Sequence, residues 1–116
     1  MEALLDRLSI MSKEKRWPLE GVKVLDLGQI YNGPYAGFLL AHAGADVIKL
    51  EPLQGEVLRQ RGGGVIPLSF AMLNTNKRGI AINLKEEKGK EILIKLVKEA
   101  DVLLENFAPN AMERLG

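Results

Sequence analysis

The sequence predicts an α/β fold in which helices flank a parallel β-sheet. Three observations lead to this prediction: short apolar runs alternate with helical segments, the loops between them are short, and the apolar runs lack the polar alternation of a half-exposed strand. Crossover connections between parallel strands are right-handed in nearly all proteins. Ligands of such sheets bind at the edge formed by the carboxyl ends of the strands.

Four short runs rich in apolar and β-branched residues are the expected strands. They are 22–27 (VKVLDL), 46–50 (DVIKL), 79–84 (GIAINL) and 101–105 (DVLLE). We expect both faces of these strands to be apolar, as in a buried parallel sheet. Asp26 is the exception, because a carboxylate inside such a strand needs polar partners, and we interpret it as part of a structural network.

Helices are expected between the strands. One covers 34–43 and ends before Gly44, and the clearest covers 85–100, where apolar residues recur at helical spacing. The stretch 53–67 is expected to be a loop, followed by one helical turn at 69–74. A further short helix is expected near the end of the chain.

Residues 1–17 are predicted to form a separate N-terminal arm. Apolar positions within 2–11 favour a short amphipathic helix, and Pro18 ends the charged stretch that follows. The arm lacks the long apolar core of a signal peptide, and no stretch approaches the roughly 20 apolar residues that span a bilayer. We therefore expect a cytoplasmic protein.

Composition restricts the possible functions. The chain has 116 residues, 47% of them hydrophobic and 27% charged, which is typical of a globular domain. Its net charge of +1 provides no overall attraction to nucleic acid or acidic membranes, and we expect it to bind neither. There is no cysteine, so disulfides, thiolate metal sites and a thiol nucleophile are excluded for this sequence.

Common catalytic and nucleotide-binding motifs do not fit. Gly28 and Gly33 lack the G-x-G-x-x-G spacing, and a P-loop would need lysine and a hydroxyl residue where the chain has Pro34 and Tyr35. A single histidine, His42, cannot build a serine-type triad, and we expect it to be a helix-end residue. No spacing of metal ligands is recognisable, so no metal site is predicted.

Several stretches, in order, resemble the N-terminal part of the family III CoA-transferases. They are PLEGVKVLDL, NGPYAGFLLAHAGADVIKLEP, LNTNKRGIAINLK and ADVLLENFAPNAMERLG, and together they cover residues 18–116. The group includes formyl-CoA transferases, carnitine CoA-transferases and α-methylacyl-CoA racemase. The resemblance implies that 18–116 form the N-terminal part of a Rossmann-like, CoA-binding domain that is incomplete here.

The resemblance also implies an enzyme that moves CoA between carboxylic acids through an aspartyl intermediate. Its substrates would be an acyl-CoA and a carboxylic acid, without a permanently bound cofactor, and the full-length form would be an interlocked homodimer. The family's catalytic aspartate belongs to a segment beyond Gly116, so no catalytic residue is assigned and the chain alone is expected to be inactive. The aspartates that do not match it are Asp6, Asp26, Asp46 and Asp101.

What the resemblance carries over to this chain is a CoA site at the ends of the strands. The residues implied are Tyr31, Asn32, Ile82, Asn83, Leu84, Lys85, Asn106, Phe107, Ala108 and Arg114. Phe107 and backbone edges would flank the adenine, and Lys85 and Arg114 would pair with phosphates. The alternative for these two cations is a solvated surface position.

Two positions depart from the formyl-CoA transferase pattern. Tyr31 replaces a glutamine that shapes the oxalate and formate site, which indicates a different acyl group. Pro52 replaces a basic residue that contacts a CoA phosphate, and Arg59 or Arg61 is a candidate replacement.

The segment NTNKR (74–78) lies at the start of its strand, away from the ligand edge. We expect its asparagines to bond to backbone. Its two bases are expected to face the partner subunit or the remainder of the protein.

Three functions remain open from the sequence. The parent protein is a CoA-transferase, or a racemase that removes and returns the α-proton of a 2-methylacyl-CoA, and the two differ in a segment downstream of residue 116. The third possibility is a non-catalytic CoA-binding module or an inactive truncated product.

Overall fold

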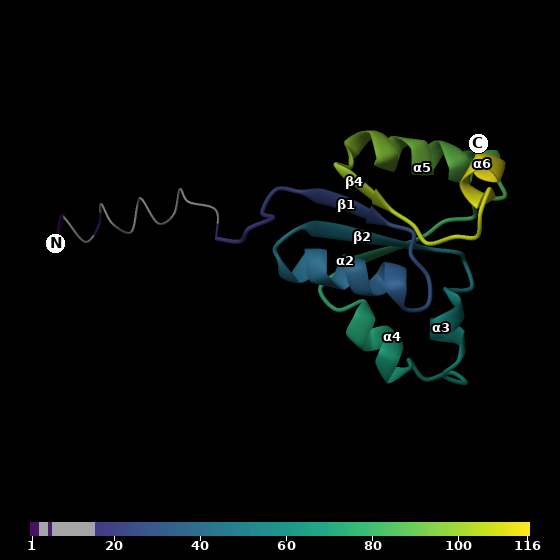
Figure 1. Ribbon diagram of the computed structural model, residues 1–116, viewed down its shortest axis with the longest axis horizontal. Helices are drawn as coiled ribbons and strands as arrows, with labels where there is room; N and C mark the ends of the chain where they lie inside the picture. Colours follow the sequence, from purple (N-terminus) through teal and green to yellow (C-terminus); the bar gives the residue numbers. More distant parts are fainter. Residues whose placement is uncertain (3–4, 6–15) are drawn as a thin grey trace.

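A computed structural model describes residues 1, 2, 5 and 16–116, and it shows a parallel sheet between two helical layers (Figure 1). The four strands are β1 (Lys23–Asp26), β2 (Asp46–Glu51), β3 (Arg78–Ala81) and β4 (Val102–Leu104). Their order is β3-β2-β1-β4, and every pair is parallel. The predicted fold class is confirmed. The helix predicted for 2–11 lies mostly outside the described residues.

Five helices connect or follow these strands in the described part of the chain. They are α2 (Asn32–His42), α3 (Val57–Gln60), α4 (Leu68–Leu73), α5 (Glu87–Glu99) and α6 (Ala111–Leu115). The chain passes from β1 to β2 and then to β3, at one edge of the sheet. Helix α5 then returns the chain to β4, which pairs with the other side of β1. Because crossovers are right-handed, this reversal places α5 on the opposite face from α2 and α4, as Figure 1 shows.

The alternation of side chains along the strands creates two apolar clusters. Leu25, Leu27 and Leu50 point to the α5 face and pack against Leu93. Val24 and Val47 point to the other face, where they form a second buried cluster with Ala41 and Ala45. Each cluster joins the sheet to one helical layer.

The expectation of two apolar faces is wrong for the half of the α2 face near the ligand edge. Asp26, Lys49 and Glu51 are buried there at 0%, 2% and 7% exposure. The Lys77 Nζ lies 2.8 Å from Asp26 Oδ2, and the Gly28 N–H donates to Asp26 Oδ1 at 2.7 Å. The structural network predicted around Asp26 is confirmed, and these partners explain why a parallel strand tolerates charge.

The third strand is shorter than predicted, because it ends at Ala81 and not at residue 84. Its neighbour in the sheet, β2, ends at Glu51, whose carbonyl accepts the last bond from the Ile82 N–H. Without a further partner the chain turns at Asn83, whose side chain accepts the Lys85 N–H at 3.1 Å.

The predicted loop at 53–67 contains the short helix α3. Its sequence gave no helical periodicity, because one turn is too short to show any. The Glu56 carboxylate begins the helix by accepting the Leu58 N–H at 3.1 Å.

For the segment 74–78, the prediction about the asparagines is confirmed and the prediction about Lys77 is wrong. Asn74 and Asn76 donate to the carbonyls of Phe70 and Ala41, as expected of backbone-bonding asparagines. The Lys77 side chain is only 1% exposed, so the prediction that it faces outward is wrong: burial against Asp26 turns it into the domain. Arg78 is exposed and pairs with Asp46.

Candidate functional site

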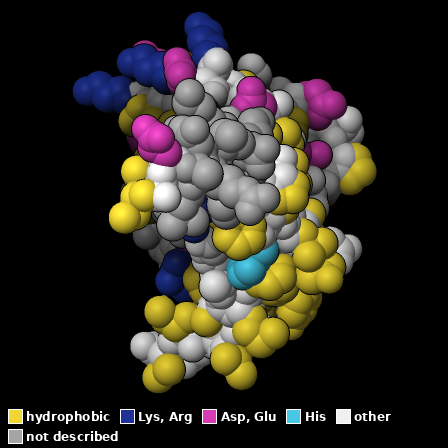
Figure 2. Space-filling model, turned by 90° about the vertical axis from the view of Figure 1, so that its left-hand side faces the viewer, with side chains coloured by type: hydrophobic (Ala, Val, Ile, Leu, Met, Phe, Trp, Pro, Cys, Tyr) yellow, Lys and Arg dark blue, Asp and Glu magenta, His cyan; other side chains and the backbone are white. Residues whose placement is uncertain are grey.

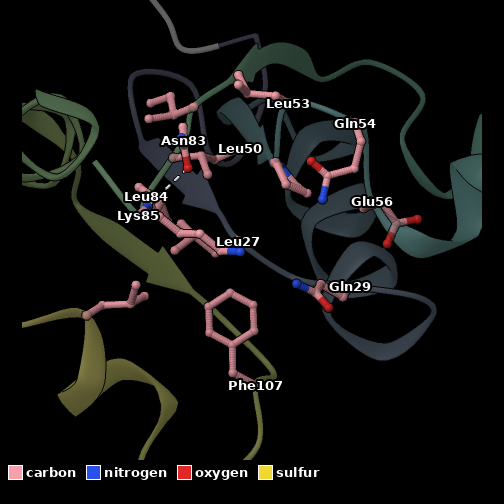
Figure 3. Close-up of a pocket in the computed structure, with 13 residues that line it drawn as sticks. Leu27, Gln29, Leu50, Leu53, Gln54, Glu56, Asn83, Leu84, Lys85 and Phe107 are labelled. Carbon is pink, nitrogen blue, oxygen red and sulfur yellow. Dashed lines mark hydrogen bonds between the residues drawn. The ribbon is translucent and has the colours of Figure 1, made fainter. Parts of the chain in front are cut away.

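A pocket of about 460 Å³ opens at the carboxyl ends of the strands (Figure 3). Its lining residues are Leu27, Gln29, Leu50, Pro52, Leu53, Gln54, Glu56, Ile82, Asn83, Leu84, Lys85, Phe107 and Leu115. They lie at the carboxyl ends of the strands or in the loops that follow them, with Leu115 added from α6. This is the edge at which parallel sheets bind ligands.

The floor of the pocket is continuous with the apolar core of the α5 face. Leu27, Leu50 and Ile82 belong to both. Figure 3 shows Asn83 and Lys85 on one side of the cavity and Gln29 on the other. An apolar floor with polar groups at opposite sides is typical of a site for an organic ligand with polar ends.

Half of the residues implied for CoA binding line this pocket. They are Ile82, Asn83, Leu84, Lys85 and Phe107. The others lie around the same edge without lining the cavity: Tyr31, Asn32, Asn106, Ala108 and Arg114. Tyr31 is half-exposed just before α2, and Asn32 is the first residue of that helix.

Asn106 holds the loop after β1. Its Oδ1 accepts the Gln29 N–H at 2.7 Å, and its Nδ2 donates to the Gln29 carbonyl at 3.0 Å. Both polar groups of the side chain are therefore used on one backbone unit. The backbone of Gly33 also passes so close that a Cβ built there would lie 2.9 Å from Asn106 Oδ1.

Three further side chains hold the same loop. Asp26 accepts the Gly28 N–H, the Lys49 Nζ donates to the Gly28 carbonyl, and Glu56 Oε2 accepts the Ile30 N–H at 2.9 Å. Lys49 and Glu56 are both 2% exposed. Side chains of β1, β2, the start of α3 and the loop after β4 thus hold loop 28–30 in place.

Glu51 and Arg59 form a paired contact beside the pocket. Arg59 donates two bonds to the Glu51 carboxylate, at 2.9 and 2.8 Å, and its guanidinium lies 4.0 Å from the centre of the Phe70 ring. Arg59 therefore has its partners within the domain. This makes Arg59 a weaker candidate to replace the CoA phosphate contact that is lost at Pro52.

Glu51 and Lys77, both near this edge, have shifted pKa values. Burial raises the pKa of Glu51, but hydrogen bonds from the Arg59 side chain and the Glu56 N–H outweigh it, so the net shift is downward. Burial lowers the pKa of Lys77, and the hydrogen bond and charge of Asp26 offset that effect only in part.

Sequence reasoning missed several lining residues, among them Gln29, Leu53, Gln54 and Glu56. Most belong to loops, whose course carries no periodic signal. Glu56 had one signal, because a carboxylate directly before the apolar pair Val57–Leu58 can cap a helix.

Within residues 1, 2, 5 and 16–116, no group of three or more histidine, cysteine, aspartate or glutamate side chains is placed to hold a metal ion. Over the same residues, no helix is long and apolar enough to cross a membrane.

The structure is an α/β domain with a pocket at the carboxyl edge of its parallel sheet. Residues 19–116 match the family model of CoA-transferase family III. The chain belongs to CoA-transferase family III.

Relatives with assigned names cover most of this chain. A formyl-CoA:oxalate CoA-transferase from Streptomyces coelicolor is 48% identical over 101 residues, which are 84% of this chain and 25% of that protein. The protein of the same name from Escherichia coli O6:H1 is 46% identical over 103 residues, 85% of this chain and 25% of that protein. The chain thus spans about a quarter of the length of these curated relatives.

Solved structures share its fold. A hypothetical protein from Mycobacterium tuberculosis superposes with a TM-score of 0.81 at 38% identity, over 90% of this chain and 28% of that one. A CAIB/BAIF family protein from Brucella suis superposes with a TM-score of 0.81 at 36% identity, over 87% of this chain and 29% of that one.

Proposed function

We propose that this chain is the CoA-binding part of an enzyme that transfers coenzyme A between carboxylic acids. The observation that supports this most is the pocket at the strand ends, which gathers Lys85 and Phe107 over an apolar floor in a chain of CoA-transferase family III. Transfer is favoured over racemisation because the curated relatives described above are named as CoA-transferases.

In this proposal the pocket receives the nucleotide end of CoA. Phe107 lies at the side of the cavity with an accessible ring and would pack against the adenine (Figure 3). Lys85, exposed at the rim, would pair with a phosphate. Arg114 would supply a second cation from α6, beside the cavity.

The covalent step would use an aspartate outside this chain. That carboxylate would attack the thioester carbonyl, form a mixed anhydride and release the CoA thiolate. The described aspartates have structural partners: Asp26 binds Lys77, Asp46 binds Arg78, and Asp101 accepts the Lys23 N–H at 2.8 Å. Their engagement supports a nucleophile from elsewhere in the protein.

Tyr31 supports an acid other than formate or oxalate. It is half-exposed beside the β1 end of the pocket, where the resemblance places a glutamine of the formyl-CoA transferases. A phenol ring replaces the amide donor and acceptor of glutamine with an apolar face and a single hydroxyl, so it would favour a different acid.

An apolar surface supports assembly into the proposed homodimer. Figure 2 shows hydrophobic side chains gathered around and below His42, on the side of α2 and α4. Exposed residues on these helices include Tyr35, Leu39, Leu68 and Met72. Monomeric proteins rarely expose large contiguous apolar patches, and a second subunit would cover this one.

Isothermal titration of the chain with CoA tests the proposal. We expect binding that Phe107→Ala weakens about tenfold, since loss of stacking on an adenine costs roughly 1–3 kcal/mol. Lys85→Ala should weaken CoA several-fold and weaken adenosine less. Lys95→Ala, an exposed lysine on α5, is the matched control and should leave the affinity unchanged.

Absence of CoA binding by the unaltered chain would contradict CoA recognition by this part of the protein. Equal effects of Lys85→Ala and Lys95→Ala would show that Lys85 acts as a surface charge only. Transfer itself requires the longer protein and is assayed as exchange of CoA between two acids.

A further inference from the structure

We propose that Glu56 is a positioning residue that holds Ile30 in a left-handed backbone conformation and so fixes the β1 side of the CoA pocket. The inference rests on the proposed function, because it assigns a role in binding CoA. It begins from an unusual backbone. Ile30 has a φ of 64°, which β-branched residues rarely adopt because Cβ meets the backbone.

The neighbours of Ile30 explain how this conformation persists. Its N–H donates to Glu56 Oε2 at 2.9 Å, a bond to a carboxylate that is only 2% exposed. Charge-assisted bonds away from water are stronger than ordinary ones, and they offset the local backbone strain. Strained residues of this kind concentrate at ligand sites.

Two further bonds fix Glu56 itself. Its other oxygen, Oε1, accepts the Leu58 N–H at 3.1 Å, and its own N–H donates to Glu51 Oε2 at 3.0 Å. Glu51 is held in turn by Arg59. A short chain of bonds therefore runs from α3 to Ile30, and both oxygens of Glu56 act as acceptors.

The conformation of Ile30 sets the places of its two neighbours in the chain. Gln29 immediately precedes it and lines the cavity beside Glu56, as Figure 3 shows, while Tyr31 follows it outside the cavity. A left-handed residue reverses the local direction of the chain. If Ile30 relaxed to an extended conformation, Gln29 and Tyr31 would both leave their present places.

Glu56→Gln tests this role with almost no change in size. An amide has one acceptor oxygen, so its NH₂ group would face either the Ile30 N–H or the Leu58 N–H. We expect CoA affinity, measured by titration calorimetry, to fall about tenfold. In ¹H–¹⁵N NMR spectra the Ile30 amide proton should lose its downfield position and its protection from exchange.

Ile30→Gly provides the rescue that distinguishes positioning from simple capping of α3. Glycine adopts positive φ without strain, so the double variant Glu56→Gln/Ile30→Gly should recover at least threefold of the lost affinity. Asn110→Gly is the matched control, because Asn110 also has positive φ, at 63°, and its side chain makes no capping bond. It should rescue nothing.

Each outcome bears on the proposal. An unchanged affinity and Ile30 amide in Glu56→Gln would overturn it, and so would a loss of affinity that Ile30→Gly fails to rescue. If Glu56→Gln does not fold, recovery of folding by the double variant supports the proposal and its failure overturns it. If the unaltered chain binds no CoA, the proposed function fails, and the Ile30 amide alone decides whether Glu56 holds the loop.

Discussion

The two faces of the sheet are buried by different means. The buried part of the α5 face is apolar, with Leu25, Leu50 and Leu93 in one cluster. The α2 face is apolar only where β1 and β2 begin, and it carries Asp26 and Lys49 where they end. Asp26 and Lys49 occupy paired positions in the register of β1 and β2.

The difference shows how the fold prepares a binding edge. Apolar contacts are nondirectional, so the α5 face stabilises the packing of helix on sheet but does not specify the course of a loop. Charged groups need partners at defined distances, and here Asp26 and Lys49 find theirs at Gly28, in the loop that leads into the pocket. The charged half of the α2 face therefore fixes the loop that the apolar face cannot.

Replacing Lys77 is expected to give the largest loss of stability. Lys77→Ala would leave Asp26 buried without its countercharge, and breaking one partner of a buried pair costs about 3–5 kcal/mol. Urea unfolding at pH 7 measures the free energy of unfolding. The cost should shrink in the double variant Lys77→Ala/Asp26→Asn, because the amide removes the unpaired buried charge.

Leu93→Ala on the other face is the comparison for that experiment. It leaves a cavity in an apolar cluster and should cost about 2–4 kcal/mol, and adding Asp26→Asn should not reduce this cost. If Asp26→Asn changed the stability of the Lys77 and Leu93 variants equally, the two faces would not be held in different ways.

A glycine pair tests whether the pocket wall depends on close packing against α5. A Cβ at Gly89 would lie 2.0 Å from the Asn83 carbonyl oxygen, so Gly89→Ala must displace the loop that carries Lys85. We expect a loss of about 1–3 kcal/mol in unfolding free energy and weaker CoA binding.

Gly79→Ala is the matched change, because a Cβ at Gly79 would meet no atom within 4 Å. It should alter stability by less than about 0.5 kcal/mol and leave CoA affinity as it is. If both alanine variants behaved alike, close packing at Gly89 would not set the position of the pocket wall.

The sequence contained enough information for the order and type of most elements, because apolar runs and the stripe of α5 are local signals. It did not show the end of β3, which depends on where its neighbour β2 stops. It also led to the wrong prediction for Lys77, because Asp26, the residue that Lys77 binds, is far from it in the sequence. Five residues of the pocket were implied by resemblance, whereas Glu56 required the structure, because its partner Ile30 is 26 positions away.

The smallest expected effect concerns acid. The pKa of Glu51 lies below its ordinary value of 4.5, so its ionised form stabilises the fold above that pH, and this contribution disappears as the pH falls through the lowered pKa. Glu51→Gln should therefore cost about 1 kcal/mol at pH 7 and progressively less in acid. Thermal unfolding of both proteins from pH 7 to pH 3 measures the difference. A difference that stays constant across this range would show that Glu51 acts through packing, and that its pairing with Arg59 contributes nothing that depends on charge.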